Sequence, residues 1–160
     1  MKFKKTIVCI LIGIILFGFS NTKAYAAEEG TVSKYELRLL SSLIYCEASS
    51  ESYQGKLAVG IVVMNRKRSS LFPDTVKDVV YEKYQFSPVT NGTLKRALSE
   101  YDAGKFTSTT ENACIKAAKA ALQGTKSITV KDSMKSFNKY LYFSGQLRNY
   151  TYQVGNHRFK

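Results

Sequence analysis

Two neighbouring segments, residues 34–49 and 53–68, constrain the fold of this 160-residue chain most strongly. Each repeats apolar residues at the spacing of a helix with one buried face. The pattern "SKYE", which starts at Ser33, opens the first segment as a capping box, and the polar stretch "SSES" separates the two segments. The sequence therefore predicts two long helices joined by a short turn, which form the centre of a single domain.

The remaining elements predict a fold that is α+β and mainly helical. A short helix is expected in "VKDVVY", an irregular loop in "YEKYQFSPVTNG", and a helix from about Thr93 to Ala103. A second capping box, "STTE", opens an alanine-rich helix that should stop at Gly124. After Gly124 the stretches "SITV", "KYLYF" and "TYQVG" are rich in β-branched and aromatic residues, as short strands are.

The first 26 residues have the order of a secretory signal peptide. Three lysines precede an apolar run over residues 7–19, and "AYA" ends at Ala26 as a small-residue cleavage site. The alternative is an uncleaved membrane anchor, although the run is shorter than the roughly 20 residues that a membrane helix needs. The expected organisation is a signal peptide (1–26), a lead-in (27–36) and one folded domain (37–160).

The charge and the cysteines limit the partners and cofactors. The formal net charge is +12, so an exported protein of this kind meets anionic polymers such as the bacterial wall, unless its lysines serve only to keep it dissolved. Export and the lack of a recognisable motif argue against nucleic acid. Cys46 and Cys114 follow the leader, and whether they form a disulfide stays open. Without a CxxC pair or a cysteine–histidine cluster, no metal or other cofactor is expected.

Glu47 falls on the apolar side of its predicted helix. At about 100° per residue, it lies near the centre of the arc that contains Leu43 and Ile44, while Ser41 and Ser42 lie opposite. Burial raises the pKa of a carboxyl group, and a general acid must carry its proton near neutral pH. The alternative is an ordinary glutamate at a frayed helix end, which reaches solvent or a lysine.

Two other reactive side chains in the same stretch are given structural interpretations. Two carboxyl groups on one helix face cannot flank a bond from opposite sides, so Glu51 is expected to favour the positive first turn of the second helix. Cys46 could pair only with His157, the one histidine of the chain, and act as a thiol peptidase. The spacing gives that pair no support, and a buried apolar role is commoner for cysteine. A serine triad would depend on the same histidine.

Several spaced blocks resemble the cell wall hydrolases of the spore cortex-lytic type (SleB/CwlJ-like). In that family an A/G/C-E-A-x-x-E segment precedes a helix that ends in asparagine and arginine, here Asn65 and Arg66. The blocks that follow in the same order are "FPDTVKDVVY", "QFSPV", "LYFSG" and "VGNHRF". The similarity covers nearly all of residues 37–159.

The resemblance implies a compact lysozyme- or transglycosylase-like domain that cleaves peptidoglycan glycan strands. The family's catalytic acid matches Glu47, and related enzymes are lytic transglycosylases that form 1,6-anhydro-muramic ends with a single acid/base. The same resemblance implies that Gln85 and Ser87 hold sugar groups in the cleft. It makes Tyr142 and His157 candidates for cleft walls or substrate hydrogen bonds.

The departures from the family pattern keep two other functions open. The chain has no tryptophan, so any sugar stacking must use tyrosine or phenylalanine. The alternatives to the transglycosylase are a lysozyme-type hydrolase and a non-catalytic wall-binding protein with the same fold. In each case the protein is expected to be secreted and associated with the cell wall or the spore cortex. Anionic wall polymers and an accessory spore protein are further candidate partners.

Overall fold

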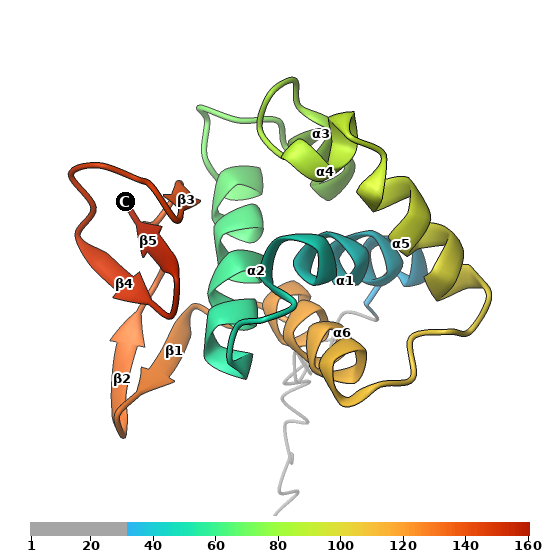
Figure 1. Ribbon diagram of the computed structural model, residues 1–160. Helices are drawn as coiled ribbons and strands as arrows, with labels where there is room; N and C mark the ends of the chain where they lie inside the picture. Colours follow the sequence, from blue (N-terminus) through green and yellow to red (C-terminus); the bar gives the residue numbers. More distant parts are fainter. Residues whose placement is uncertain (1–31) are drawn as a thin grey trace, which may run out of the picture.

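The computed structural model describes residues 32–160, and the expected signal peptide and residues 27–31 lie outside this range. Six helices precede five short strands in the described part. Figure 1 shows α2 between the other helices and the strands. None of the described helices is both long and apolar enough to cross a membrane. The fold is α+β and mainly helical, as the sequence predicts.

The helices begin and end close to their predicted bounds. The five predicted from the sequence are α1 (Lys34–Ala48), α2 (Tyr53–Arg68), α3 (Val76–Tyr81), α5 (Thr93–Asp102) and α6 (Thr109–Leu122). The prediction of an irregular loop up to Gly92 was wrong in one place, because residues Ser87–Thr90 form the one-turn helix α4. Pro88 suits this turn, since a proline in the first helical positions gives up no intrahelical hydrogen bond.

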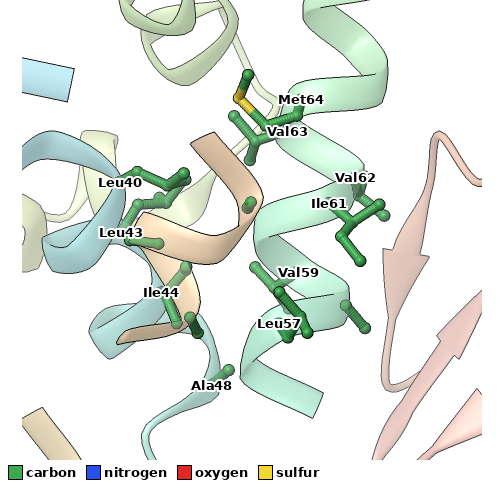
Figure 2. Close-up of a cluster of buried hydrophobic side chains, with 14 of the residues drawn as sticks. Leu40, Leu43, Ile44, Ala48, Leu57, Val59, Ile61, Val62, Val63 and Met64 are labelled. Atoms are coloured by element: carbon green, nitrogen blue, oxygen red, sulfur yellow. The ribbon is translucent and has the colours of Figure 1, made fainter. Parts of the chain in front are cut away.

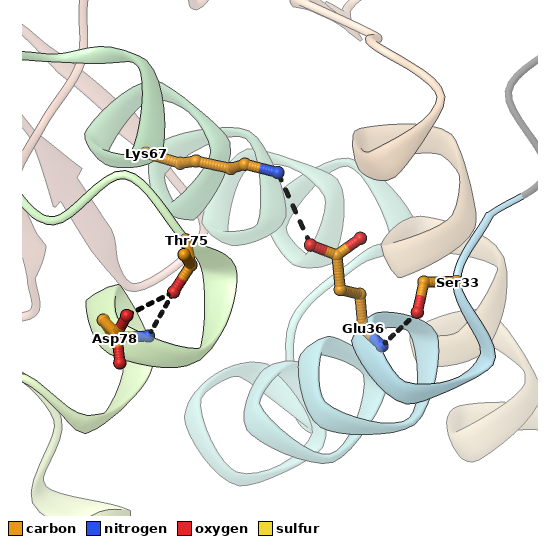
Figure 3. A network of polar contacts seen from close by, with 5 residues as sticks. All are labelled: Ser33, Glu36, Lys67, Thr75 and Asp78. Carbon is orange, nitrogen blue, oxygen red and sulfur yellow. Dashed lines mark hydrogen bonds and ion pairs between the residues drawn. The ribbon is translucent and has the colours of Figure 1, made fainter.

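Serine caps explain why the starts of α1 and α6 could be predicted from the sequence. Ser108 and Glu111 form a complete capping box, because the Ser108 side chain accepts from Glu111 N and the Glu111 carboxylate accepts from Ser108 N. The box at α1 is only half made. Ser33 accepts from Glu36 N, but the Glu36 carboxylate lies 3.4 Å from Lys67 Nζ and links the start of α1 to the end of α2 (Figure 3).

The strands form two small antiparallel sheets. A hairpin pairs β1 (Ser127–Val130) with β2 (Ser133–Ser136), and a second sheet has the order β3 (Phe143–Ser144), β5 (His157–Phe159), β4 (Tyr152–Val154). The sequence predicts β1 and β4, but "KYLYF" contributes only Phe143 to a strand. The strands β2 and β5 were missed, because "SMKS" and "HRF" become strands only through their partners.

The core surrounds α1, whose apolar side chains meet those of α2 and α6 (Figure 2). A Cβ at Gly60 would lie 3.0 Å from Ala121 Cβ and 3.1 Å from Ile44 Cδ1, so the missing side chain lets three helices approach closely. The prediction that Ser41 and Ser42 face away from the core was wrong. Both are fully buried, and α1 packs against α3 and α5 as well as against α2 and α6.

Two buried charged side chains hold the α1–α2 joint (residues 49–52). The Lys56 ammonium donates to the carbonyl oxygen of Ser49 at 2.9 Å and to that of Glu51, which satisfies carbonyl groups beyond the end of α1. Glu51 is only 8% exposed, and its carboxylate accepts from the backbone N–H and the side-chain amide of Asn156. Glu51 is therefore structural, but it binds the β4–β5 turn rather than the first turn of α2.

Gly155 is the position where this arrangement is least tolerant. Its φ is +55°, and an added Cβ would lie 1.7 Å from Glu51 Oε2. We expect Gly155→Ala to lower the free energy of unfolding by about 2 kcal/mol or more, because it combines the left-handed penalty with displacement of a buried carboxylate. Urea denaturation measures the change. Gly145→Ala is the matched control: its Cβ would lie 3.5 Å from the nearest atom, so a change within about 0.5 kcal/mol is expected. Equal stability of the two variants would contradict the prediction.

Candidate active site

Glu47 lies in the last turn of α1, directly before the α1–α2 joint. Its side chain is half-buried, and burial raises the pKa of the carboxyl group above its usual value, while the positive charge of Arg66 offsets part of that shift. The result is a carboxyl group that holds its proton more tightly than one in water. A raised pKa is what the position of Glu47 on the apolar side of its predicted helix led us to expect.

Glu47 opens into a pocket of about 370 Å³ between the end of α1, α4 and α5. The pocket is lined from α1 and its end by Tyr45, Cys46, Glu47 and Ser49, from α4 and its end by Ser87, Pro88 and Asn91, and from α5 by Thr93, Arg96, Ala97 and Glu100. Of the four residues predicted to bind substrate, Ser87 lines the same pocket as Glu47. Gln85, Tyr142 and His157 are not among the residues that line it.

Glu100 supplies a second carboxyl group that the sequence analysis missed. It lines the same pocket as Glu47 but comes from α5, so the two carboxyl groups belong to different helices. The signal was present in the spacing: Thr93, Arg96 and Glu100 are three and four residues apart and therefore share one face of α5. Because neighbouring Ala97 and Leu98 are buried, this face borders the core and leads directly to the pocket.

Arg66 provides a fixed positive charge near Glu47. Its side chain is buried, Arg66 Nε donates to the Leu141 carbonyl oxygen at 2.7 Å, and the guanidinium carbon lies 5.0 Å from the ring centroid of Phe72 and 5.1 Å from that of Phe86. Tyr142 forms a third side of this aromatic cage at 5.7 Å. Burial lowers the pKa of Arg66, and the negative charges of Glu82 and Glu47 act against that shift.

Tyr142 and His157 therefore occupy different surroundings from Glu47 itself. Tyr142 is 43% exposed and packs against Phe72, beside the arginine whose charge acts on Glu47. His157 lies on β5 with its ring 5.2 Å from that of Phe143. Burial lowers the pKa of His157, partly offset by Glu51, so burial favours its neutral form.

The "QFS" block places its three side chains in three environments. Gln85 is half-buried in the turn before α4, where its backbone N–H donates to the Glu82 carbonyl oxygen at 3.2 Å. Phe86 is buried in the Arg66 cage, and Ser87 reaches the pocket. Phe86 therefore has a packing role, while Gln85 lies next to the pocket segment without lining the pocket.

Cys46 lines the pocket as a free thiol, and Cys114 is a second free thiol in the core. Burial raises the pKa of both, that of Cys114 to about 11, so both are protonated thiols at neutral pH. His157 does not line the pocket beside Cys46, so no thiol–histidine pair is formed there. Among residues 32–160, no group of three or more histidine, cysteine or acidic side chains is arranged to hold a metal ion.

Comparisons with known proteins agree on one family and one fold. A family model described as Cell Wall Hydrolase matches residues 50–160, which begins three residues after Glu47. A spore cortex-lytic enzyme of Oceanobacillus iheyensis is 40% identical over 62 residues, or 39% of this chain and 22% of that protein. One from Bacillus subtilis is 35% identical over 83 residues, or 47% of this chain and 27% of that protein. The matched parts thus span about a quarter of these curated relatives.

Two solved structures share the fold. The catalytic domain of the Bacillus cereus SleB protein superposes with a TM-score of 0.58 and 24% identity, over 81% of this chain and 92% of that domain. The catalytic domain of the germination-specific lytic transglycosylase SleB from Bacillus anthracis gives a TM-score of 0.58 and 22% identity, over 81% of this chain and 97% of that one. At this identity the likeness concerns the fold.

The state of the two thiols gives a direct test of the pocket. We expect iodoacetamide to modify Cys46 well before Cys114, because Cys46 is partly exposed in the pocket and Cys114 is fully buried. Modification of Cys46 should speed up as the pH rises, since the thiolate is the reactive form and burial raises the pKa. Peptide mapping by mass spectrometry, without reductant, locates the label. A Cys46–Cys114 disulfide, or equal labelling of the two residues in the folded protein, would contradict the arrangement.

Proposed function

Because the chain belongs to the cell wall hydrolase family, we propose that it degrades peptidoglycan by cutting the glycan strand between N-acetylmuramic acid and N-acetylglucosamine. The observation that carries the proposal is the half-buried Glu47 carboxyl group, which opens into a pocket lined mainly by polar side chains. A group of this kind suits general acid catalysis at a glycosidic bond. The names of the relatives, spore cortex-lytic enzymes, support the same substrate class.

The reaction we propose is that of a lytic transglycosylase with Glu47 as the only acid/base. Glu47 gives its proton to the glycosidic oxygen, and the bond from this oxygen to C1 of the muramic sugar breaks. The C6 hydroxyl of the same sugar attacks C1, and its proton passes to the Glu47 carboxylate. The products are a 1,6-anhydro-muramic end and a free C4 hydroxyl, so no water is consumed and the acid is regenerated.

The fixed charge of Arg66 fits this cycle. Glu47 alternates between the neutral acid and the carboxylate, and a nearby cation favours the carboxylate that forms when the proton leaves. Burial and the arginine thus act in opposite directions on the pKa of Glu47, which keeps both forms accessible. A general acid/base must reach both protonation states in each turnover.

In this proposal the other predicted site residues differ in how close they lie to the bond that is cut. Ser87 binds sugar hydroxyl or acetamido groups directly, because it lines the pocket. Tyr142 acts beside Arg66, and Gln85 and His157 bind sugar units that extend past the pocket. The protein is secreted after removal of the 1–26 leader and acts in the cell wall or spore cortex, where its basic surface also meets anionic polymers. An accessory spore protein as a partner is part of the same proposal.

A hydrolase of the lysozyme type is the second candidate, and Glu100 is the observation that favours it. A second carboxyl group from another helix could activate a water molecule opposite the acid, as inverting enzymes require. The two reactions differ in product: the hydrolase leaves reducing muramic ends, and the transglycosylase leaves 1,6-anhydro ends.

Paired substitutions separate these reactions. We expect Glu47→Gln to reduce cleavage of purified sacculi by about 10²- to 10⁴-fold, which is the typical contribution of a general acid. Glu100→Gln should keep activity within about tenfold and still yield 1,6-anhydro ends. Mass spectrometry of the released muropeptides measures both, and circular dichroism verifies that each variant is folded. Full activity in a folded Glu47→Gln protein would refute the assignment, and loss of activity in Glu100→Gln would favour the hydrolase.

The same digestion tests the remaining alternatives. Cys46→Ser should retain activity, because the thiol lines the pocket without a histidine partner. New free amino groups in the digest, lost in Cys46→Ser, would indicate the thiol peptidase. Binding of the wild-type protein to sacculi without any released muropeptide would indicate the non-catalytic wall-binding protein.

The raised pKa of Glu47 predicts a pH dependence in activity and in stability. Activity should fall on the alkaline side as the pH rises through a pKa above the ordinary glutamate value of about 4.3, because the acid must be protonated. A carboxyl group whose pKa is raised by folding contributes stability below its unfolded pKa and loses it as the pH rises. The wild type should therefore become less stable relative to Glu47→Gln between about pH 4 and pH 7. Urea titrations at both pH values measure this difference, and an unchanged difference would mean that Glu47 is not desolvated.

A further inference from the structure

Tyr84 is the most exposed large apolar side chain of the described part of the chain. It lies in the turn between α3 and α4, with 82% of its surface exposed. An isolated exposed aromatic residue is ordinary on a protein surface and needs no function by itself. Its backbone conformation and its place in the sequence separate Tyr84 from the other exposed tyrosines.

The turn at Tyr84 takes a conformation that normally calls for glycine. The Gln85 N–H donates to the Glu82 carbonyl oxygen at 3.2 Å, which closes a four-residue turn with Lys83 and Tyr84 at its centre. Tyr84 has a φ of +67°, and Lys83 does not have a positive φ. This is the pattern of a type II turn, whose third position favours glycine or asparagine. A bulky aromatic residue at positive φ is strained and uncommon.

No packing in the fold accounts for the tyrosine. With 82% of its surface exposed, the side chain contributes little to the core, so the strain is not compensated by burial. Strained residues that persist without a packing role are found at ligand-binding positions, where the ring or group must be displayed in a fixed direction. A glycine would form the same turn without strain, and it would lose only the ring.

The turn leads directly into the pocket. Ser87 and Pro88, which line the pocket beside Glu47, follow Tyr84 by three and four residues. Three steps of 3.8 Å place the Cα atoms of Tyr84 and Ser87 within about 11 Å of each other. Between them, Phe86 is anchored in the Arg66 cage, which fixes the path of the chain from the turn to the pocket. Tyr84 itself is outside the pocket, so it can meet only a substrate that extends beyond it.

We propose that Tyr84 is a sugar-stacking platform that binds a unit of the glycan strand beyond the pocket that contains Glu47. This inference rests on the proposed function, because a glycan strand is the polymer that would pass from the pocket over the turn. The ring presents a flat apolar face to the apolar face of a sugar ring, and it occupies the role that tryptophan would otherwise serve in a chain that has none.

Lys83 complements the platform. Its Nζ lies 5.0 Å from the centroid of the Tyr84 ring, over one face, which leaves the other face free for a sugar. The ammonium group is also placed to meet anionic or hydroxyl groups of a strand that lies on the turn. Stacking itself depends little on charge, so it should persist at high ionic strength, whereas a contribution from Lys83 should weaken.

The test uses glycine, the residue that the turn prefers. In the Glu47→Gln background, which prevents cleavage, we expect Tyr84→Gly to weaken binding to purified sacculi by about 3- to 10-fold, the range for loss of one aromatic stacking contact. Its melting temperature should be equal to or higher than that of the parent, because glycine relieves the strain at φ +67°. Tyr84→Phe, which keeps the ring, should bind within about twofold of the parent. Co-sedimentation at low and high salt measures the affinity.

Two controls separate the ring from the backbone. Asn149→Gly changes another exposed residue of positive φ, and Tyr35→Ala removes another exposed tyrosine ring; neither should alter binding. In the active protein, Tyr84→Gly should raise KM for sacculi and leave kcat unchanged. Unaltered affinity of Tyr84→Gly would overturn the proposal, as would no binding by the parent. Binding that depends on Tyr84, together with no muropeptide release by the wild type, would uphold the platform and reject the catalytic function.

Discussion

The fold depends on one buried carboxylate, that of Glu51, which accepts two hydrogen bonds from Asn156 across 105 positions of sequence. On one side of it, the Lys56 ammonium binds the carbonyl groups of the α1–α2 joint. On the other side, the β4–β5 turn passes over it at Gly155. The helical and the sheet parts are thus connected at the end of α1. A buried charge is tolerated here because hydrogen bonds replace the water that it loses.

The position of Glu47 follows from that connection. It lies in the last turn of α1, directly before the joint, so whatever fixes the end of α1 also fixes the carboxyl group that we propose as the acid. The chemical demand on Glu47 differs from that on Glu51, although both are glutamates four residues apart. Glu51 accepts hydrogen bonds from both the backbone N–H and the side-chain amide of Asn156 and serves the fold. Glu47 is half-buried with a raised pKa, so its ionised form costs stability and its protonated form is favoured relative to a glutamate in water.

Local signals in the sequence predicted the helices well and the contacts between them poorly. The starts of α1 and α6 were predicted because Ser33 and Ser108 cap their helices through hydrogen bonds within three residues. The burial of Ser41 and Ser42 could not be predicted in this way, since it depends on which helices pack against α1. The strand β5 likewise exists only through its pairing with β3 and β4.

The same division runs through the candidate site. The position of Glu47 around its helix axis could be predicted from the sequence, because this position depends only on the spacing of residues within one helix. The pairing of Glu51 with Asn156, the cage around Arg66 and the meeting of Glu100 with Glu47 in one pocket join residues far apart in the chain. Periodicity contains no information on such distances. The spacing within α5 would have placed Glu100 on the correct face, but it could not show that this face lines the same pocket as Glu47.

The contact between Glu51 and Gly155 also has a consequence for how this chain can change over evolutionary time. As long as position 51 carries a glutamate, position 155 has no room for a side chain, since Oε2 occupies the place of its Cβ. A larger residue at 155 would have to displace this carboxylate, and it would still carry the strain of a φ of +55° whatever residue stands at 51. Because the two positions share this space, substitutions at 51 and 155 should not have additive effects on stability.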